Sequence, residues 1–293
     1  MDRLDSRRLT GGMSEQPILV TGATGKSGSR VVRQLRAKGL PVRAAARTGE
    51  HVFDWNDSGT WDAALAGAQS VYIVQLDGTR LVRPFVERAV RHGVRRLVLA
   101  SGRGIDNPDY AKDPTGMAAA MADSEAAVRQ SGLEWTISRP GWFAQNFNEG
   151  FFADAIRAGE LRLPGGDGAA SFVDAQDIAA VVVAALTEDR HSGQIYELSG
   201  PRAVTLAEAV ATIAEASGRA IRYVPLPVDE YVAELVQQGL PPVEAEAFAE
   251  IIIALRDGKD EHVSDGVPRA LGRPARTFAE FAESTAAEGG WQA

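Results

Sequence analysis

The chain of 293 residues contains no cysteine, which excludes disulfides, thiolate metal sites and cysteine nucleophiles. No apolar run approaches the ~20 residues of a membrane helix, and residues 1–16 carry no signal-peptide core. We therefore expect a cytoplasmic protein with no membrane partner. We also expect no metal site, because the four histidines show no ligand spacing: His51, His92, His191 and His262.

Basic residues are few in the second half of the chain, so the net charge is unevenly spread. Residues 1–150 hold 20 basic and 16 acidic side chains, and residues 151–293 hold 11 and 23, so the net charges are +4 and −12. A nucleic-acid duplex would be repelled by the second half and meets no basic recognition motif, so we expect no nucleic-acid partner. A phosphate-rich small molecule suits the first half.

A glycine-rich turn follows the predicted strand 18–20 and precedes the predicted helix 30–37. Its eight residues, TGATGKSG, space their glycines as G-x-x-G-x-x-G. This spacing lets the chain turn sharply, lets a pyrophosphate approach the backbone, and begins a helix whose free amides face the phosphates. With the next predicted strand, 42–46, the turn completes a βαβ unit typical of dinucleotide binding.

Arg47 ends the second predicted strand, 19 residues after Gly28. An acidic residue in this region would bind the ribose hydroxyls of NAD, whereas an arginine pairs with the 2′-phosphate of NADP. The sequence therefore predicts NADP(H) as the cofactor, with an ordinary surface arginine as the alternative.

Strands and helices alternate at regular spacing, with further apolar strands predicted at 70–75, 96–100 and 132–138. This rhythm predicts an α/β fold, a doubly wound parallel Rossmann sheet with a smaller C-terminal α/β substrate lobe. Helix caps are expected at Thr60, Asp174, Thr205 and Thr277. The predicted organisation is a disordered extension (1–16), an NAD(P)-binding Rossmann domain (17–140), a substrate-side lobe packed on it with an interleaved chain (141–285), and a tail (286–293).

Several segments together resemble the NmrA-like branch of the atypical short-chain dehydrogenase/reductases. Besides the glycine turn they are Asp54-Trp55, the run RPGWFAQNF at 139–147 and the run FVDAQDIA at 172–179. The resemblance implies NADP(H) binding and members of two kinds. Some reduce quinones, azo dyes or natural-product intermediates, and others are redox-sensing regulators without turnover.

The resemblance also implies roles for individual residues. Asp54 and Trp55 would lie at the adenine edge, while Gln75 and Ser101 would flank the nicotinamide ribose, next to Pro140. Ligands of open α/β sheets bind at the carboxyl ends of the strands, although Gln75 and Ser101 could equally be simple strand ends. The residues expected around the pyrophosphate are Gly22, Thr24, Gly25, Lys26, Ser27 and Gly28.

The sequence departs from typical short-chain dehydrogenases because it contains no Tyr-x-x-x-Lys pair. Met121 and Glu125 occupy those two positions, and methionine cannot move a proton. Tyr110 and Lys112 would supply a substitute acid if their loop closes over the site, and Glu125 would do so if burial raised its pKa. Otherwise Tyr110 and Lys112 lie in a surface loop and Glu125 is solvated.

Aromatic residues after Pro140 predict an apolar wall beside the nicotinamide, or alternatively plain core. Asn146 would hydrogen-bond a substrate carbonyl. The candidate pocket residues are Trp142, Phe143, Asn146, Phe147 and Tyr231.

The sequence thus predicts an NADPH-dependent reductase that transfers hydride to a quinone-like or aromatic natural-product intermediate of polyketide type. A missing tyrosine favours delocalised acceptors, since these spread the incoming charge and can take a proton from water. Two alternatives remain: a non-catalytic NADP(H)-sensing regulatory protein, and an aromatic polyketide tailoring or coupling enzyme. We expect a monomer or a homodimer.

Overall fold

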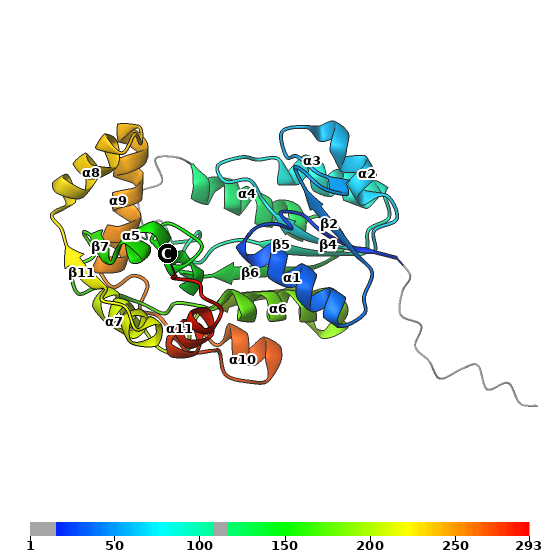
Figure 1. Cartoon of the computed structure of the whole chain (residues 1–293). Helices are drawn as coiled ribbons and strands as arrows, with labels where there is room; N and C mark the ends of the chain where they lie inside the picture. Colours follow the sequence, from blue (N-terminus) through cyan, green and yellow to red (C-terminus); the bar gives the residue numbers. More distant parts are fainter. Residues whose placement is uncertain (1–15, 108–109, 111–115, 293) are drawn as a thin grey trace, which may run out of the picture.

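A seven-stranded parallel sheet forms the centre of the molecule, in a computed structural model that describes residues 16–107, 110 and 116–292 (Figure 1). The strand order is β3-β2-β1-β4-β5-β6-β9, so the chain winds outward in both directions from β1. The predicted doubly wound Rossmann-like sheet is confirmed. The strand bounds are β1 (Ile18–Val20), β2 (Val42–Ala46), β3 (His51–Val52), β4 (Ser70–Val74), β5 (Arg96–Ala100), β6 (Glu134–Pro140) and β9 (Gln194–Leu198).

Helices cover both faces of this sheet (Figure 1). On one face lie α1 (Lys26–Ala37) and α6 (Ala175–Thr187), with α10 (Gly266–Leu271) beside α6. The other face carries α2 (Trp61–Leu65), α3 (Val82–Arg91) and α4 (Met117–Arg129). The strands are apolar on both faces because both are buried under helices.

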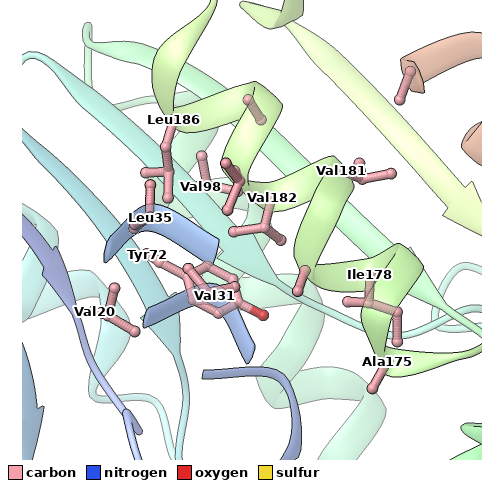
Figure 2. Packing of buried hydrophobic residues seen from close by; sticks show 14 of the residues in the cluster. Val20, Val31, Leu35, Tyr72, Val98, Ala175, Ile178, Val181, Val182 and Leu186 are labelled. Carbon is pink, nitrogen blue, oxygen red and sulfur yellow. The ribbon is translucent and has the colours of Figure 1, made fainter. Parts of the chain in front are cut away.

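Side chains alternate between the two layers of core, as the pleat of a strand requires. Figure 2 shows Val20, Tyr72 and Val98 of the sheet packed with Val31 of α1 and Val182 of α6. Their neighbours along the strands, such as Leu19, Val71 and Leu97, belong to the core on the opposite face. Burial of this apolar surface stabilises the sheet and fixes the strand ends that carry the site.

The second half of the chain interleaves with the first. Helix α6 packs against α1, and β9 pairs in parallel with β6 as the last strand of the sheet. We did not predict β9 from the sequence, because its run Gln-Ile-Tyr-Glu-Leu alternates polar and apolar residues only briefly. The division into domains at residue 140 stays a prediction.

The remaining elements form a smaller lobe at the carboxyl ends of the strands (Figure 1). Here β7 pairs in parallel with β11, and β8 pairs antiparallel with β10. An aromatic core that includes Phe147, Phe172 and Phe278 holds the lobe together. The elements of the lobe are α5 (Ala153–Ala158), β7 (Glu160–Leu163), β8 (Ala169–Ala170), β10 (Val204–Thr205), α7 (Leu206–Ser217), β11 (Arg222–Pro225), α8 (Val228–Gln237), α9 (Pro242–Arg256), α11 (Phe278–Ala287) and the short 3-10 turn η2 (Ala144–Phe147). Two other 3-10 turns lie beside the central sheet: η1 (Ser58–Thr60) leads into α2, and η3 (Asp189–His191) follows α6.

Three of the four predicted helix caps are confirmed. The side chain of Thr60 does not cap α2, because its hydroxyl accepts from the amide of Asp54 and donates to the carbonyl of Asp57. Asp174 accepts a hydrogen bond from the amide of Gln176, and Thr205 accepts one from the amide of Glu208. Thr277 and Glu280 form a complete capping box at the start of α11. Among the described residues, we find no helix with the length and apolar character needed to cross a membrane.

Candidate cofactor and acceptor site

The glycine turn joins the carboxyl end of β1 to α1 and requires glycine at two of its three positions. Gly22 has φ +59°, and a Cβ there would lie 2.9 Å from Cβ of Val74. A Cβ on Gly28 would lie 2.2 Å from the carbonyl oxygen of Gly22. By contrast, a Cβ on Gly25 would be 3.3 Å from its nearest neighbour, that same oxygen. The fold therefore does not require glycine at position 25, and the missing side chain leaves space there for a ligand.

The start of α1 is suited to an anionic group. Gly25 is the N-cap residue and has no side chain with which to cap the helix. The first-turn amides and the positive end of the helix dipole are therefore available to a phosphate. Thr24 and Gly25 are exposed at the mouth of the turn, while Ser27 is buried and its hydroxyl accepts a hydrogen bond from Tyr72. The predicted pyrophosphate site is thus exposed at Thr24 and Gly25, and it is backed by the buried, hydrogen-bonded side chain of Ser27.

Arg47 directly follows β2 and is exposed, and we find no hydrogen bond or ion pair to its guanidinium within the described ranges. Asp54 is half-buried, and its carboxylate accepts the amide of Asn56. Trp55 lies in the core, where its indole N–H donates to the carbonyl of Val74 at 2.9 Å. The predicted adenine contact of these two residues is untested; any role of Trp55 is limited to an edge of its ring.

Three predicted residues lie together at the carboxyl ends of adjacent strands. Gln75, Ser101 and Pro140 follow or end β4, β5 and β6, which are neighbours in the sheet. The side-chain carbonyl oxygen of Gln75 accepts a hydrogen bond from the hydroxyl of Ser124 at 2.7 Å. The hydroxyl of Ser101 donates a hydrogen bond to the carboxylate of Glu125 at 2.7 Å. Ser101 is thereby oriented so that its oxygen remains an acceptor, as contact with a ribose hydroxyl would require.

Glu125 is buried and bound on both oxygens by one arginine. Arg139 donates to its two carboxylate oxygens at 2.8 Å each, and Ser101 donates to one of them. Arg139 also donates to Asp106, and these contacts, above all the one with Glu125, raise the pKa of the guanidinium. Both oxygens of Glu125 accept hydrogen bonds from these donors, which argues against Glu125 as the acid; that role stays a prediction. The alternative of a solvated Glu125 is wrong, because its side chain is buried.

The hydroxyl of Tyr110 is hydrogen-bonded to Asp260, in the second half of the chain. The hydroxyl donates this bond, at 2.6 Å. Burial, followed by the charge of Asp260, raises the pKa of Tyr110. Arg103 fastens the same loop by donating to the backbone carbonyl of Asp260. These contacts argue against Tyr110 as the acid, and Lys112 lies outside the described residues.

We expect Tyr110→Phe to lower stability without changing the chemistry. The buried carboxylate of Asp260 would lose a donor, which costs about 1–3 kcal/mol of unfolding free energy. Urea unfolding measures this loss, with Tyr223→Phe as the matched control because its hydroxyl makes only a 3.4 Å contact to a carbonyl. A kcat that falls sharply in a folded Tyr110→Phe variant would instead restore the catalytic role.

The predicted pocket aromatics divide between wall and core. Trp142 is half-buried and stacks on Phe152 with ring centroids 6.0 Å apart. Phe143 is also half-buried and packs at the edge of the sheet core. Phe147 is fully buried and Tyr231 nearly so, and both belong to the core of the lobe. Trp142 and Phe143 therefore remain candidates for the wall, whereas Phe147 and Tyr231 have core environments.

Contacts that we did not predict join the cofactor turn and α1 to η2 and the segment that follows it. Lys26 donates from Nζ to the side-chain carbonyl of Asn146 at 2.9 Å, and the ring centroid of Phe151 lies 5.4 Å from Nζ. Arg30 of α1 forms a two-point ion pair with Glu149. The partners are about 120 residues apart in the sequence, so no local spacing reveals these contacts; only the motif around Asn146 drew attention to the segment.

Comparison with known proteins agrees with this geometry. Residues 22–189, more than half of the chain, match a family described as NAD(P)H-binding, and the chain belongs to this family. It is 36% identical over 286 residues to an NAD(P)H azoreductase from Xenophilus azovorans, covering 92% of this chain and 98% of the relative. It is 39% identical over 291 residues to a (4-alkanoyl-5-oxo-2,5-dihydrofuran-3-yl)methyl phosphate reductase from Streptomyces griseus, covering 92% and 100%.

Solved structures give the same result. An NADPH-dependent quinone oxidoreductase from Escherichia coli is 25% identical with a TM-score of 0.71, covering 91% of this chain and 98% of that one. The resemblance to NmrA-like reductases and the NAD(P)H cofactor are confirmed. The protein is an NAD(P)H-dependent oxidoreductase.

Proposed function

We propose that this protein is an NADPH-dependent reductase that delivers hydride to a quinone-like or aromatic natural-product acceptor. The observation that carries the acceptor class is the side chain where short-chain dehydrogenases have their tyrosine. Met121 lies beside Gly102, with its sulfur 3.4 Å from the position of a Cβ on that glycine. A thioether cannot supply a proton. The acceptor must therefore stabilise the incoming charge itself, by delocalising it.

The relatives support this class of acceptor. Azo groups, quinones and the conjugated oxo-dihydrofuran named in the relatives' descriptions share an extended π system that takes up hydride readily. Trp142 and Phe143 provide flat apolar surface at the end of β6, which suits such acceptors. A small ketone would gain little from these contacts.

The residues would hold the cofactor in a defined order along the strand ends. The pyrophosphate would bind the amides at the start of α1, and Gln75 and Ser101 would contact the nicotinamide ribose. The cofactor supplies the hydride, and the protein fixes the distance between the nicotinamide and the acceptor. We further propose a cytoplasmic monomer or homodimer, in keeping with a chain that has no cysteine.

Arg47 would select NADPH over NADH. In Arg47→Ala we expect KM for NADPH to rise about tenfold to a hundredfold, the effect of losing charge-assisted hydrogen bonds to a phosphate, while KM for NADH stays unchanged. The measurement is steady-state reduction of a quinone with each dinucleotide. Arg43→Ala is the matched control, because Arg43 lies on the same strand but donates to the carbonyls of Ala64 and Ala66. An equal rise of KM for both cofactors in Arg47→Ala would contradict the assignment.

A panel of acceptors, each assayed at the same NADPH concentration, tests the proposed class of acceptor. Quinones, azo dyes and conjugated lactones should be reduced, and simple aliphatic ketones of similar size should not. Faster turnover of the ketones would overturn the proposal, because aliphatic ketones lack the extended π system that the proposal requires of the acceptor.

A further inference from the structure

The side chain of Lys26 leaves its own turn and reaches the opposite lobe. Its ammonium donates to Asn146, lies beneath the ring of Phe151, and occupies space that a Cβ on Gly150 would fill, 2.4 Å from Nζ. Within the described ranges no carboxylate lies within 4.0 Å of this ammonium, since the neighbouring Glu149 is bound by Arg30. Lys26 thus keeps a charge that is only partly satisfied by a neutral amide.

The position of Nζ distinguishes it from the phosphate-binding amides of the same turn. Asn146 lies in η2, which follows the end of β6 and the half-buried rings of Trp142 and Phe143. An acceptor must lie on the nicotinamide, between the strand ends and this segment, for hydride transfer to occur. Through Asn146, the ammonium is therefore held at the segment that follows Trp142 and Phe143 and that would border the acceptor.

We propose that Lys26 is the catalytic acid of this reductase, with Asn146 as the residue that positions its ammonium. The proposal rests on the reductase function proposed above. Hydride leaves C4 of NADPH with its electron pair and bonds to the acceptor, whose π electrons move to an oxygen or nitrogen. An N–H of Lys26 gives that atom its proton, NADPH becomes NADP⁺, and the amine regains a proton from water.

The surroundings of Lys26 suit this role. Burial lowers the pKa of its ammonium below 10.5; Arg30 acts in the same direction and Glu149 opposes it. A lower pKa brings the acid closer to the pH at which the enzyme works and makes proton transfer easier. The half-buried ammonium also stabilises the negative charge that develops on the acceptor.

The test compares two acceptors that differ in their need for a proton. A quinone requires hydride and a proton, whereas a cationic triphenylmethane dye is neutralised by hydride alone. In Lys26→Arg, which keeps the charge but holds its proton too tightly to donate it, we expect kcat with the quinone to fall about 10²-fold. The dye should be reduced at close to the wild-type rate, and Kd for NADPH should be nearly unchanged. Lys26→Gln should show the same loss with the quinone.

Lys38→Arg is the matched control, because Lys38 lies exposed at the opposite end of α1. An equal loss with both acceptors and a raised Kd for NADPH in Lys26→Arg would assign Lys26 to the cofactor alone and overturn the proposal. Unchanged quinone reduction would overturn it as well. A wild-type protein that binds NADPH but reduces no acceptor would instead reject the reductase function.

A second readout covers the case in which the dye is not accepted. With the quinone in D₂O, the wild type should show a normal solvent isotope effect on single-turnover reduction, and Lys26→Arg should lose it. The same isotope effect in both proteins would contradict proton donation by Lys26.

Discussion

Gly25→Trp should abolish NADPH binding while the protein remains folded. Gly25 has φ −79°, which any residue adopts, and its nearest neighbour to an added Cβ is 3.3 Å away, so the fold needs only a small shift. The indole would fill the space above the start of α1 where the pyrophosphate is expected. We expect Kd for NADPH to rise at least ~10³-fold, or about 4 kcal/mol, as measured by quenching of tryptophan fluorescence or by calorimetry.

Two further substitutions calibrate this result. Gly25→Ala adds only a methyl group and should weaken NADPH binding slightly. Gly28→Ala places the same methyl group 2.2 Å from the carbonyl oxygen of Gly22, so it should distort the turn and lower the melting temperature. If Gly25→Trp bound NADPH within tenfold of the wild type, the cofactor would not lie across this turn.

Arg139→Met should destabilise the protein strongly while leaving the cofactor turn intact. Arg139 and Glu125 have side chains 9% and 4% exposed, and their ion pair is joined by Ser101. Removing the arginine leaves a buried carboxylate without its counter-charge, which costs about 3–5 kcal/mol of unfolding free energy. Urea denaturation followed by circular dichroism measures this change.

The control is Arg157→Met, since Arg157 pairs with a fully exposed Asp154 one turn away on α5. Such surface pairs contribute about 0–1 kcal/mol. A double variant, Arg139→Met with Glu125→Leu, should recover part of the lost stability, because no buried charge remains. If the single and double variants were equally unstable, the loss would come from packing and not from the unpaired carboxylate.

The cofactor half of the site was predictable because its information is local. Gly22, Gly25 and Gly28 stand at fixed spacing between a strand and a helix, and Arg47 follows the next strand. Backbone conformation and the order of strands determine what such a segment can bind. The sheet was predictable for a similar reason, since its strands are short apolar runs separated by helices.

The acceptor half depends on contacts between distant parts of the sequence. Tyr110 meets Asp260 across 150 residues, and Lys26 meets Asn146 across 120. Aromatic spacing predicted Trp142 and Phe147 equally well, yet only the structure distinguishes the half-buried ring from the core ring. The sequence left Glu125 open between a buried acid and a solvated residue; only the structure shows that it is buried and paired with Arg139.

The central claim is tested most directly by one single-turnover experiment. The protein is loaded with NADPH, mixed rapidly with a quinone, and followed by the absorbance of the reduced nicotinamide. We expect complete oxidation of bound NADPH in the wild type and none by Gly25→Trp under the same conditions. Tight NADPH binding without oxidation by any quinone, azo dye or conjugated natural-product acceptor would contradict the account and favour a protein that senses NADP(H) without turnover.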